Sequence, residues 1–141
     1  SKDLKSRKVG ERQLIGFRRV FDYVEHEHTL YADTLSTGSC VHAHAHFKKT
    51  KLGADFIGKP DIPAEKIGEE CAKLLKREMD SGACLDKWMG DQILPYVALA
   101  GGGKFSVSEI TNHTRTNIWV IEKFLPVKFE INGNVIQCKK I

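Results

Sequence analysis

The segment IGEECAKLLKREM, residues 67–79, does most to set the fold class of this 141-residue chain. Its apolar residues recur at i, i+4, i+7, i+8 and i+12, which is the spacing of one helix face, and charged residues occupy the opposite face. Pro63 can serve as the first helical residue, and Ser81-Gly82 is a stop signal. The pattern predicts an amphipathic helix that buries one face.

The residues before this helix predict one helix and three strands. Val9–Phe21 follows a helical stripe, and Asp22–Tyr31 alternates in a way that favours a strand. Cys40–Phe47 alternates strictly, and Lys51–Phe56 fits as its hairpin partner. Ile57–Pro63 has the composition of a linker, so we expect a domain boundary there.

The residues after it predict short helices separated by turns. Asp86 can cap a helix whose apolar stripe begins at Trp88, and Pro95 should either kink it or divide it into two. Gly101-Gly102-Gly103 ends that stretch, and Phe105–Glu109 is predicted as a short strand.

A helix and a hairpin follow this strand. Thr111 or Asn112 should cap a helix over His113–Phe124, and a hairpin should follow from Val127–Ile131 to Val135–Lys139 through an Asn-Gly turn. The order of elements predicts an α+β fold with helices packed on mixed sheets, in two lobes.

The composition excludes several classes of protein. Hydrophobic residues make up 41% of the chain, which is enough for a core. No apolar run approaches the roughly 18 residues that span a bilayer, and the first residues lack the apolar stretch of a secretory leader. The four cysteines show no zinc spacing, so we expect buried structural thiols in a reduced, cytoplasmic protein without a membrane partner.

The basic charge is concentrated at the N-terminal end. Ser1–Arg19 holds seven Lys or Arg and two Asp or Glu, whereas the remaining residues hold 15 and 16. Such an end can attract nucleic acid or nucleotide phosphates, and a solvated tail explains the same residues.

Three of the six histidines alternate along one predicted strand. His42, His44 and His46 would share one face, with spacings of about 7 Å between neighbours along the strand. A cross-strand metal site with His26 and His28 is one interpretation, and a solvent-facing strand is the other. Because no further ligand completes a known spacing, we predict no functional metal site there.

His113 stands at a predicted helix start, with polar residues and Arg115 close by. A helix N-terminus favours anions, so a neutral imidazole there could act as a nucleophile toward phosphorus. A capping motif beside a surface histidine explains the same residues, and the pattern alone leaves both interpretations open.

Several motifs together resemble the RNA 3′-terminal phosphate cyclase family. In GACLDKWMGDQILPYVALA, residues 82–100, an aromatic residue, two variable positions and Asp-Gln precede an apolar run that ends in Ala-Leu-Ala, as in that family. HTRTNI, residues 113–118, and FLPVKF, residues 124–129, resemble its C-terminal block. The ordered set extends upstream to residues 9–13, 36–39 and 58–70, most like archaeal members.

The resemblance implies a domain plan. Family members are longer, with a large domain of repeated α+β units similar to the C-terminal domain of translation initiation factor three, and a smaller inserted domain. Residues 1–56 would belong to the insert, and residues 57–141 would be the last repeat of the large catalytic domain. The N-terminal repeats would lie outside this chain. The three-histidine strand departs from the family, where that strand is mostly aliphatic.

The resemblance also implies a ligase chemistry that uses ATP. Carried over, His113 would form an adenylyl-histidine, and an RNA 3′-phosphate would become a 2′,3′-cyclic phosphodiester with a divalent cation, Mg or Mn, as cofactor. The adenylate would be bound by the run Trp88, Met89, Gly90, Asp91 and Gln92. Here Trp88 replaces the more usual Tyr or His, and its alternative interpretation is a core aromatic.

The resemblance implies that the partners are ATP and RNA with a 3′-phosphate end. The chain alone should be inactive, and it should associate with the absent N-terminal portion or form a homo-oligomer. Two alternatives stay open, a non-catalytic relative that acts in ribosome assembly and a stand-alone RNA-binding module. The presence of His113 argues against the first, because that branch lacks the nucleophile.

Overall fold

A computed structural model describes all 141 residues, which form two compact units. The first unit contains Ser1–Ala45 and Gly53–Arg77, and the second contains His46–Leu52 and Glu78–Ile141. The main division along the chain therefore falls after Arg77, and not within residues 57–63. The assignment of 1–56 and 57–141 to two domains of a longer protein stays a prediction. None of the helices is long and apolar enough to cross a membrane.

The first unit is built from helices and a two-stranded antiparallel hairpin. The predicted helix α1, strands β1 and β2 and long helix α2 are all confirmed, and a short 3-10 helix η1 precedes them. Their bounds are η1 Lys2–Arg7, α1 Val9–Arg18, β1 Cys40–His46, β2 Lys51–Ile57 and α2 Ala64–Asp80.

The predicted strand at Asp22–Tyr31 is wrong, because those residues form no strand. The segment binds to α1 through side chains instead. The Tyr31 hydroxyl accepts from the Gly10 N–H at 3.0 Å and donates to Glu11 at 2.5 Å. Most of the side chains of this segment are exposed, so its alternation corresponds neither to a strand nor to a buried face.

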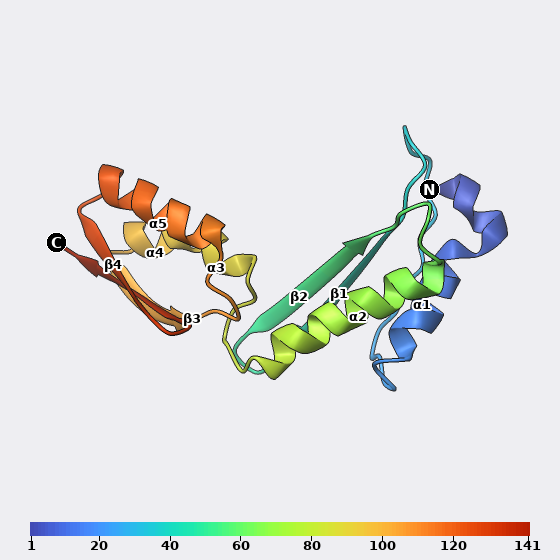
Figure 1. Cartoon of the computed structure of the whole chain (residues 1–141), viewed down its shortest axis with the longest axis horizontal. Coiled ribbons are helices and arrows are strands. Elements are labelled where there is room, and N and C mark those ends of the chain that lie inside the picture. The colour runs from blue at the N-terminus through green and yellow to red at the C-terminus, as the bar shows by residue number, and fades with distance from the viewer. The chain divides into compact units, whose positions relative to one another are not determined.

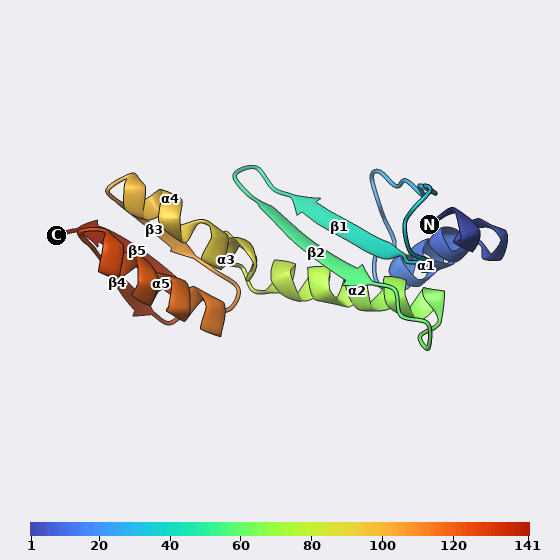
Figure 2. The ribbon, with the colours of Figure 1, turned by 90° about the horizontal axis from the view of Figure 1, so that it is seen from above.

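Helix α2 lies along the hairpin, and both views in Figures 1 and 2 show this arrangement. Its predicted stripe is buried at Ile67, Cys71 and Leu75. The Cys71 thiol lies 3.6 Å from the carbonyl oxygens of Val41 and Ala54, one on each strand. Cys71 and Cys138 are buried as expected, Cys84 is half-buried, and Cys40 is exposed, so the expectation of a buried thiol is wrong at Cys40.

The second unit packs three helices on one face of a three-stranded antiparallel sheet with the order β3-β5-β4 (Figure 2). The buried core between the layers is formed by Leu94, Ala98, Val107, Ile118, Val127, Phe129, Ile136 and Cys138. The bounds are α3 Met89–Gln92, α4 Leu94–Leu99, β3 Gly102–Ser106, α5 Asn112–Phe124, β4 Val127–Asn132 and β5 Val135–Lys140. The helix-on-sheet arrangement is as predicted, but both sheets are antiparallel where we expected mixed sheets, and a single parallel bridge joins Leu85 to Val107.

Proline and glycine set the details of this unit. Pro95 lies in the first turn of α4, so the predicted stripe is divided into two short helices. Strand β3 begins three residues earlier than predicted, because Gly102 and Gly103 already pair with Lys139 and Cys138 of β5. Gly133 adopts a left-handed φ of 59° in the Asn-Gly turn, which confirms the predicted hairpin of β4 and β5.

Candidate active site

His113 is exposed at the start of α5, in the second unit. The preceding Thr111 is the cap, since its hydroxyl oxygen accepts from the Thr114 N–H at 3.1 Å. This confirms the predicted cap and leaves the N–H groups of Asn112 and His113 at the open end of the helix, where they favour an anion. The exposed guanidinium of Arg115 adds positive charge to the same turn.

The Asp86 carboxylate caps the turn that leads into α3, where the predicted adenylate-binding run lies. The Asp86 carboxylate is 8% exposed and accepts from the N–H groups of Trp88 at 3.1 Å and Met89 at 2.8 Å. Asp86 was predicted to cap a helix, and it caps the turn that directly precedes α3. Because α3 packs against α5, the run and His113 belong to neighbouring helices of one layer.

Trp88 is 52% exposed, which disfavours its interpretation as a core aromatic. The ammonium group of Lys87 lies 4.6 Å from the centroid of its ring, within the range of a cation–π interaction. Lys87 was not among the candidate site residues predicted from the sequence. The signal was present in the Lys-Trp dipeptide, but only the structure shows that the two side chains turn toward each other.

The other four residues of the run have different environments. Met89 and Gln92 are exposed, and Asp91 is half-buried. Gly90 is buried, and a Cβ atom there would lie 2.8 Å from Cγ1 of Val107. Gly90 therefore serves the close packing of α3 on the core, and the side chains that can reach a ligand belong to its neighbours.

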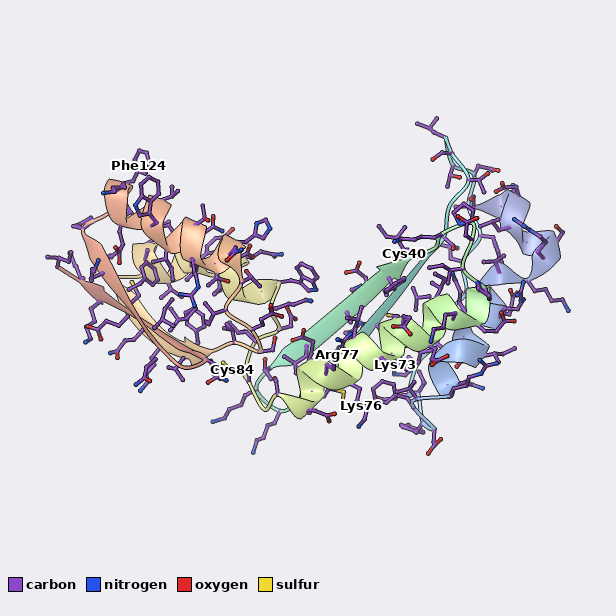
Figure 3. All side chains as sticks on the ribbon, in the orientation of Figure 1. Cys40, Lys73, Lys76, Arg77, Cys84 and Phe124 are labelled. Atoms are coloured by element: carbon purple, nitrogen blue, oxygen red, sulfur yellow. The ribbon has the colours of Figure 1, made fainter.

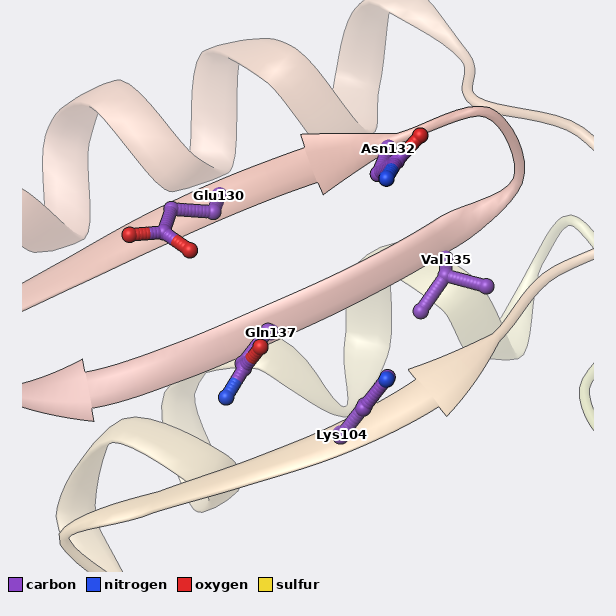
Figure 4. A pocket seen from close by; sticks show the side chains of 5 residues that line it. All are labelled: Lys104, Glu130, Asn132, Val135 and Gln137. Carbon is purple, nitrogen blue, oxygen red and sulfur yellow. The ribbon is translucent and has the colours of Figure 1, made fainter.

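A surface depression lies elsewhere in the same unit. It measures about 370 Å³ and lies on the sheet face opposite the helices (Figure 4). Its lining contains none of the predicted site residues and consists of Lys104, Glu130, Asn132, Val135 and Gln137. The candidate site is thus an exposed surface of two helix starts and not an enclosed pocket.

The chain brings together no cluster of three or more His, Cys, Asp or Glu that could hold a metal ion. The histidines of β1 are exposed, with the ring centroids of His42 and His44 5.8 Å apart. The ring centroids are closer than the repeat of about 7 Å along the strand, and the two ring planes are inclined to each other by 45°. His26 and His28 do not form the neighbouring strand that a cross-strand site requires.

The chain is similar in sequence to known proteins over most of its length. The chain is 42% identical over 107 residues to an RNA 3′-terminal phosphate cyclase of Pyrococcus abyssi, covering 76% of this chain and 31% of that protein. It is 40% identical over 126 residues to the protein of that name from Methanococcoides burtonii, covering 87% of this chain and 37% of the relative. The chain spans about a third of the length of these curated relatives.

The family comparison extends over most of the sequence. A sequence model described as RNA 3′-terminal phosphate cyclase matches residues 4–131, which include the capped starts of α3 and α5 and all the predicted site residues. The chain belongs to the RNA 3′-terminal phosphate cyclase family.

Proposed function

We propose that this chain is the C-terminal portion of an enzyme that converts an RNA 3′-terminal phosphate into a 2′,3′-cyclic phosphodiester with ATP. Two observations support the proposal, membership of the cyclase family and the exposed imidazole of His113 at a capped helix start. The second carries the chemistry, because a nucleophile must be accessible and the developing charge must be stabilised.

In the first step, an imidazole nitrogen of His113 attacks the α-phosphorus of ATP, and the bond to pyrophosphate breaks. The N–H groups at the open end of α5 lie beside the charge that develops on the phosphoryl oxygens. The adenylyl group then passes to an oxygen of the RNA 3′-phosphate, which frees the imidazole. The vicinal 2′-hydroxyl finally attacks the activated phosphorus, loses its proton and expels AMP.

The residues around α3 would hold the adenosine part of the nucleotide. The exposed indole of Trp88 offers one face for stacking, since the Lys87 ammonium lies over the ring. The Asp91 carboxylate can accept from the ribose hydroxyls, and the Gln92 amide can serve the ribose or a phosphate. The chain forms no cluster of three or more His, Cys, Asp or Glu that could hold the divalent cation.

The helix layer of the second unit supports the proposal that more protein covers it. Tyr96 and Leu99 of α4 are 69% and 72% exposed, and Trp119 and Phe124 of α5 are 63% and 82% exposed. Phe124 projects from the end of its helix in Figure 3. Apolar side chains gathered on one layer mark an interaction surface. We propose that the N-terminal portion of the protein, or a second copy, covers them, and that the chain alone is inactive.

A labelling experiment tests the proposed function. A longer protein that includes the N-terminal portion is incubated with α-labelled ATP, as wild type and as His113→Asn. The wild type should retain the label in an acid-labile and alkali-stable bond, as expected for a phosphoramidate, and the variant should bind ATP without retaining label. His26→Asn, which removes an exposed imidazole in the other unit, is the matched control and should label normally.

Two results would contradict the assignment. Label on the His113→Asn protein, or label that maps to a lysine, would show that another group is the nucleophile. A wild-type protein that binds RNA but neither binds ATP nor takes label would favour the non-catalytic alternative.

A further inference from the structure

Thr114 follows the proposed nucleophile directly, yet its environment is the opposite of that of His113. Its side chain is fully buried, with 0% exposure, whereas the histidine is exposed. The Thr114 and Thr111 hydroxyl oxygens lie 3.0 Å apart and share a hydrogen bond. A buried hydroxyl is retained only where it has a partner, and here Thr111 is that partner.

The two threonines form a closed pair. The Thr111 oxygen meets both the N–H and the hydroxyl of Thr114, at 3.1 and 3.0 Å. The pair fixes the backbone on both sides of His113, since one threonine precedes it by two residues and the other follows it. The carbonyl of Thr111 also accepts the Arg115 N–H at 3.1 Å, which closes the first turn of α5.

The imidazole itself has no such support within the chain. No hydrogen bond or ion pair joins the His113 side chain to another residue, so its position is set by its backbone and its own rotamer. Transfer to phosphorus requires the reacting atoms to be held about 3 Å apart and in line, and a displacement of about 1 Å can cost about a hundredfold in rate.

We propose that Thr111 and Thr114 are positioning residues that hold His113 in place for attack on the α-phosphorus. The inference rests on the proposed function. The pair acts through the backbone of His113 and does not touch the nucleotide. Its loss should therefore slow transfer to the imidazole and leave the affinity for ATP unchanged.

The test uses substitutions that conserve shape or conserve the hydroxyl, in the longer protein. Thr114→Val and Thr111→Val remove the hydroxyl at nearly constant volume, and Thr114→Ser and Thr111→Ser retain it. Ile118→Val, which trims a 9% exposed residue on the same helix face, is the control for a loss of packing alone. The rate of label transfer from α-labelled ATP is measured in a single turnover, and the Kd for ATP and the Tm are measured separately.

The valine variants should transfer the label at least about tenfold more slowly with an unchanged Kd, while the serine variants stay within about threefold of wild type. Ile118→Val should lower the Tm and leave the transfer rate unchanged. If the valine variants label as fast as wild type, or if Ile118→Val slows the transfer as much as they do, the positioning role is overturned. A wild-type protein that takes no label overturns the proposed function as well.

Discussion

Gly16 of α1 lies directly against the carbonyl oxygen of Glu65 in α2, so that a Cβ atom on Gly16 would be 1.7 Å from that oxygen. The contact is reciprocal, because a Cβ atom on Gly68 of α2 would be 1.7 Å from the carbonyl oxygen of Gln13. The two helices of the first unit therefore meet backbone to backbone, and no side chain fits between them.

This contact makes a prediction for stability. Gly16→Ala and Gly68→Ala should each destabilise the first unit by about 1–3 kcal/mol, since backbone atoms cannot move aside as a side chain would. Gly38→Ala is the control, because no atom lies within 4 Å of a Cβ at that position. Denaturant unfolding of the three variants tests this. A Gly68→Ala protein as stable as the control would show that the helices can separate at little cost.

The ion pair between Arg12 and Glu65 predicts a pH dependence. The guanidinium donates to both carboxylate oxygens, at 2.7 and 2.8 Å, and these hydrogen bonds lower the Glu65 pKa from 4.5 to about 2. A lowered folded-state pKa means that the stabilisation is fully present above about pH 4.5 and is lost as the pH falls toward 2. The unfolding free energies of wild type and Glu65→Gln should therefore differ at pH 7 and converge across that window. A difference that stays constant down to pH 2 would contradict the assignment.

Glu122 of α5 should protect the open edge of β4. One carboxylate oxygen accepts a hydrogen bond from the Phe129 N–H at 2.7 Å, and the other accepts one from the Lys128 ammonium at 2.8 Å. Burial alone would raise the Glu122 pKa, but these two donors outweigh it and lower the pKa. Because β4 is an edge strand, a free N–H there can pair with another chain.

Glu122→Ala should therefore self-associate and lose about 1–3 kcal/mol of stability, whereas Glu122→Gln retains an acceptor for Phe129 and should stay closer to wild type. Sedimentation at several concentrations measures the association. If the alanine and glutamine variants associate to the same extent and are equally stable, the Glu122 side chain does not protect the edge of β4 from pairing with another chain.

The proposed adenylate-binding run should separate into packing and binding positions. Gly90→Ala pushes α3 away from Val107 and should lower the Tm, and Trp88→Ala removes a half-exposed ring and should weaken ATP binding about tenfold with a smaller change in Tm. ATP titration and thermal unfolding of both variants make the comparison. A Trp88→Ala protein that binds ATP as tightly as wild type would contradict this prediction and favour a structural role for Trp88.

The histidines of β1 should capture added metal without depending on it. Two tilted rings 5.8 Å apart can take up nickel weakly, but no third ligand joins them in a cluster. We expect dialysis against a weak chelator to strip the metal and leave the Tm unchanged. Stoichiometric zinc or nickel that survives dialysis, and whose loss unfolds the protein, would contradict this prediction.

Local chemistry made much of the fold predictable. The Asn-Gly turn, the caps at Asp86 and Thr111 and the stripe of α2 depend on neighbours in the sequence, and all are confirmed. The prediction of a strand at 22–31 failed because alternation alone supplies no partner strand, and most of these side chains are exposed.

Some features of the candidate site could likewise be predicted from the sequence, and others could not. The exposure of His113 at a capped helix start could be predicted from the sequence. The burial of Gly90 against Val107 and the position of Lys87 over Trp88 could not be predicted, because they depend on how α3 meets the core and on rotamers.

The order of strands in the second unit has a consequence for how the chain is made. Strand β5 lies between β3 and β4, although it follows both in the sequence. During synthesis, β3 therefore cannot pair with its neighbour β5 until Val135–Lys140 has left the ribosome, and its hydrogen-bonding groups stay unpaired until then. A premature stop before Val135 would remove only the last residues of the chain, yet it would separate the two remaining strands and leave the helices no sheet to cover.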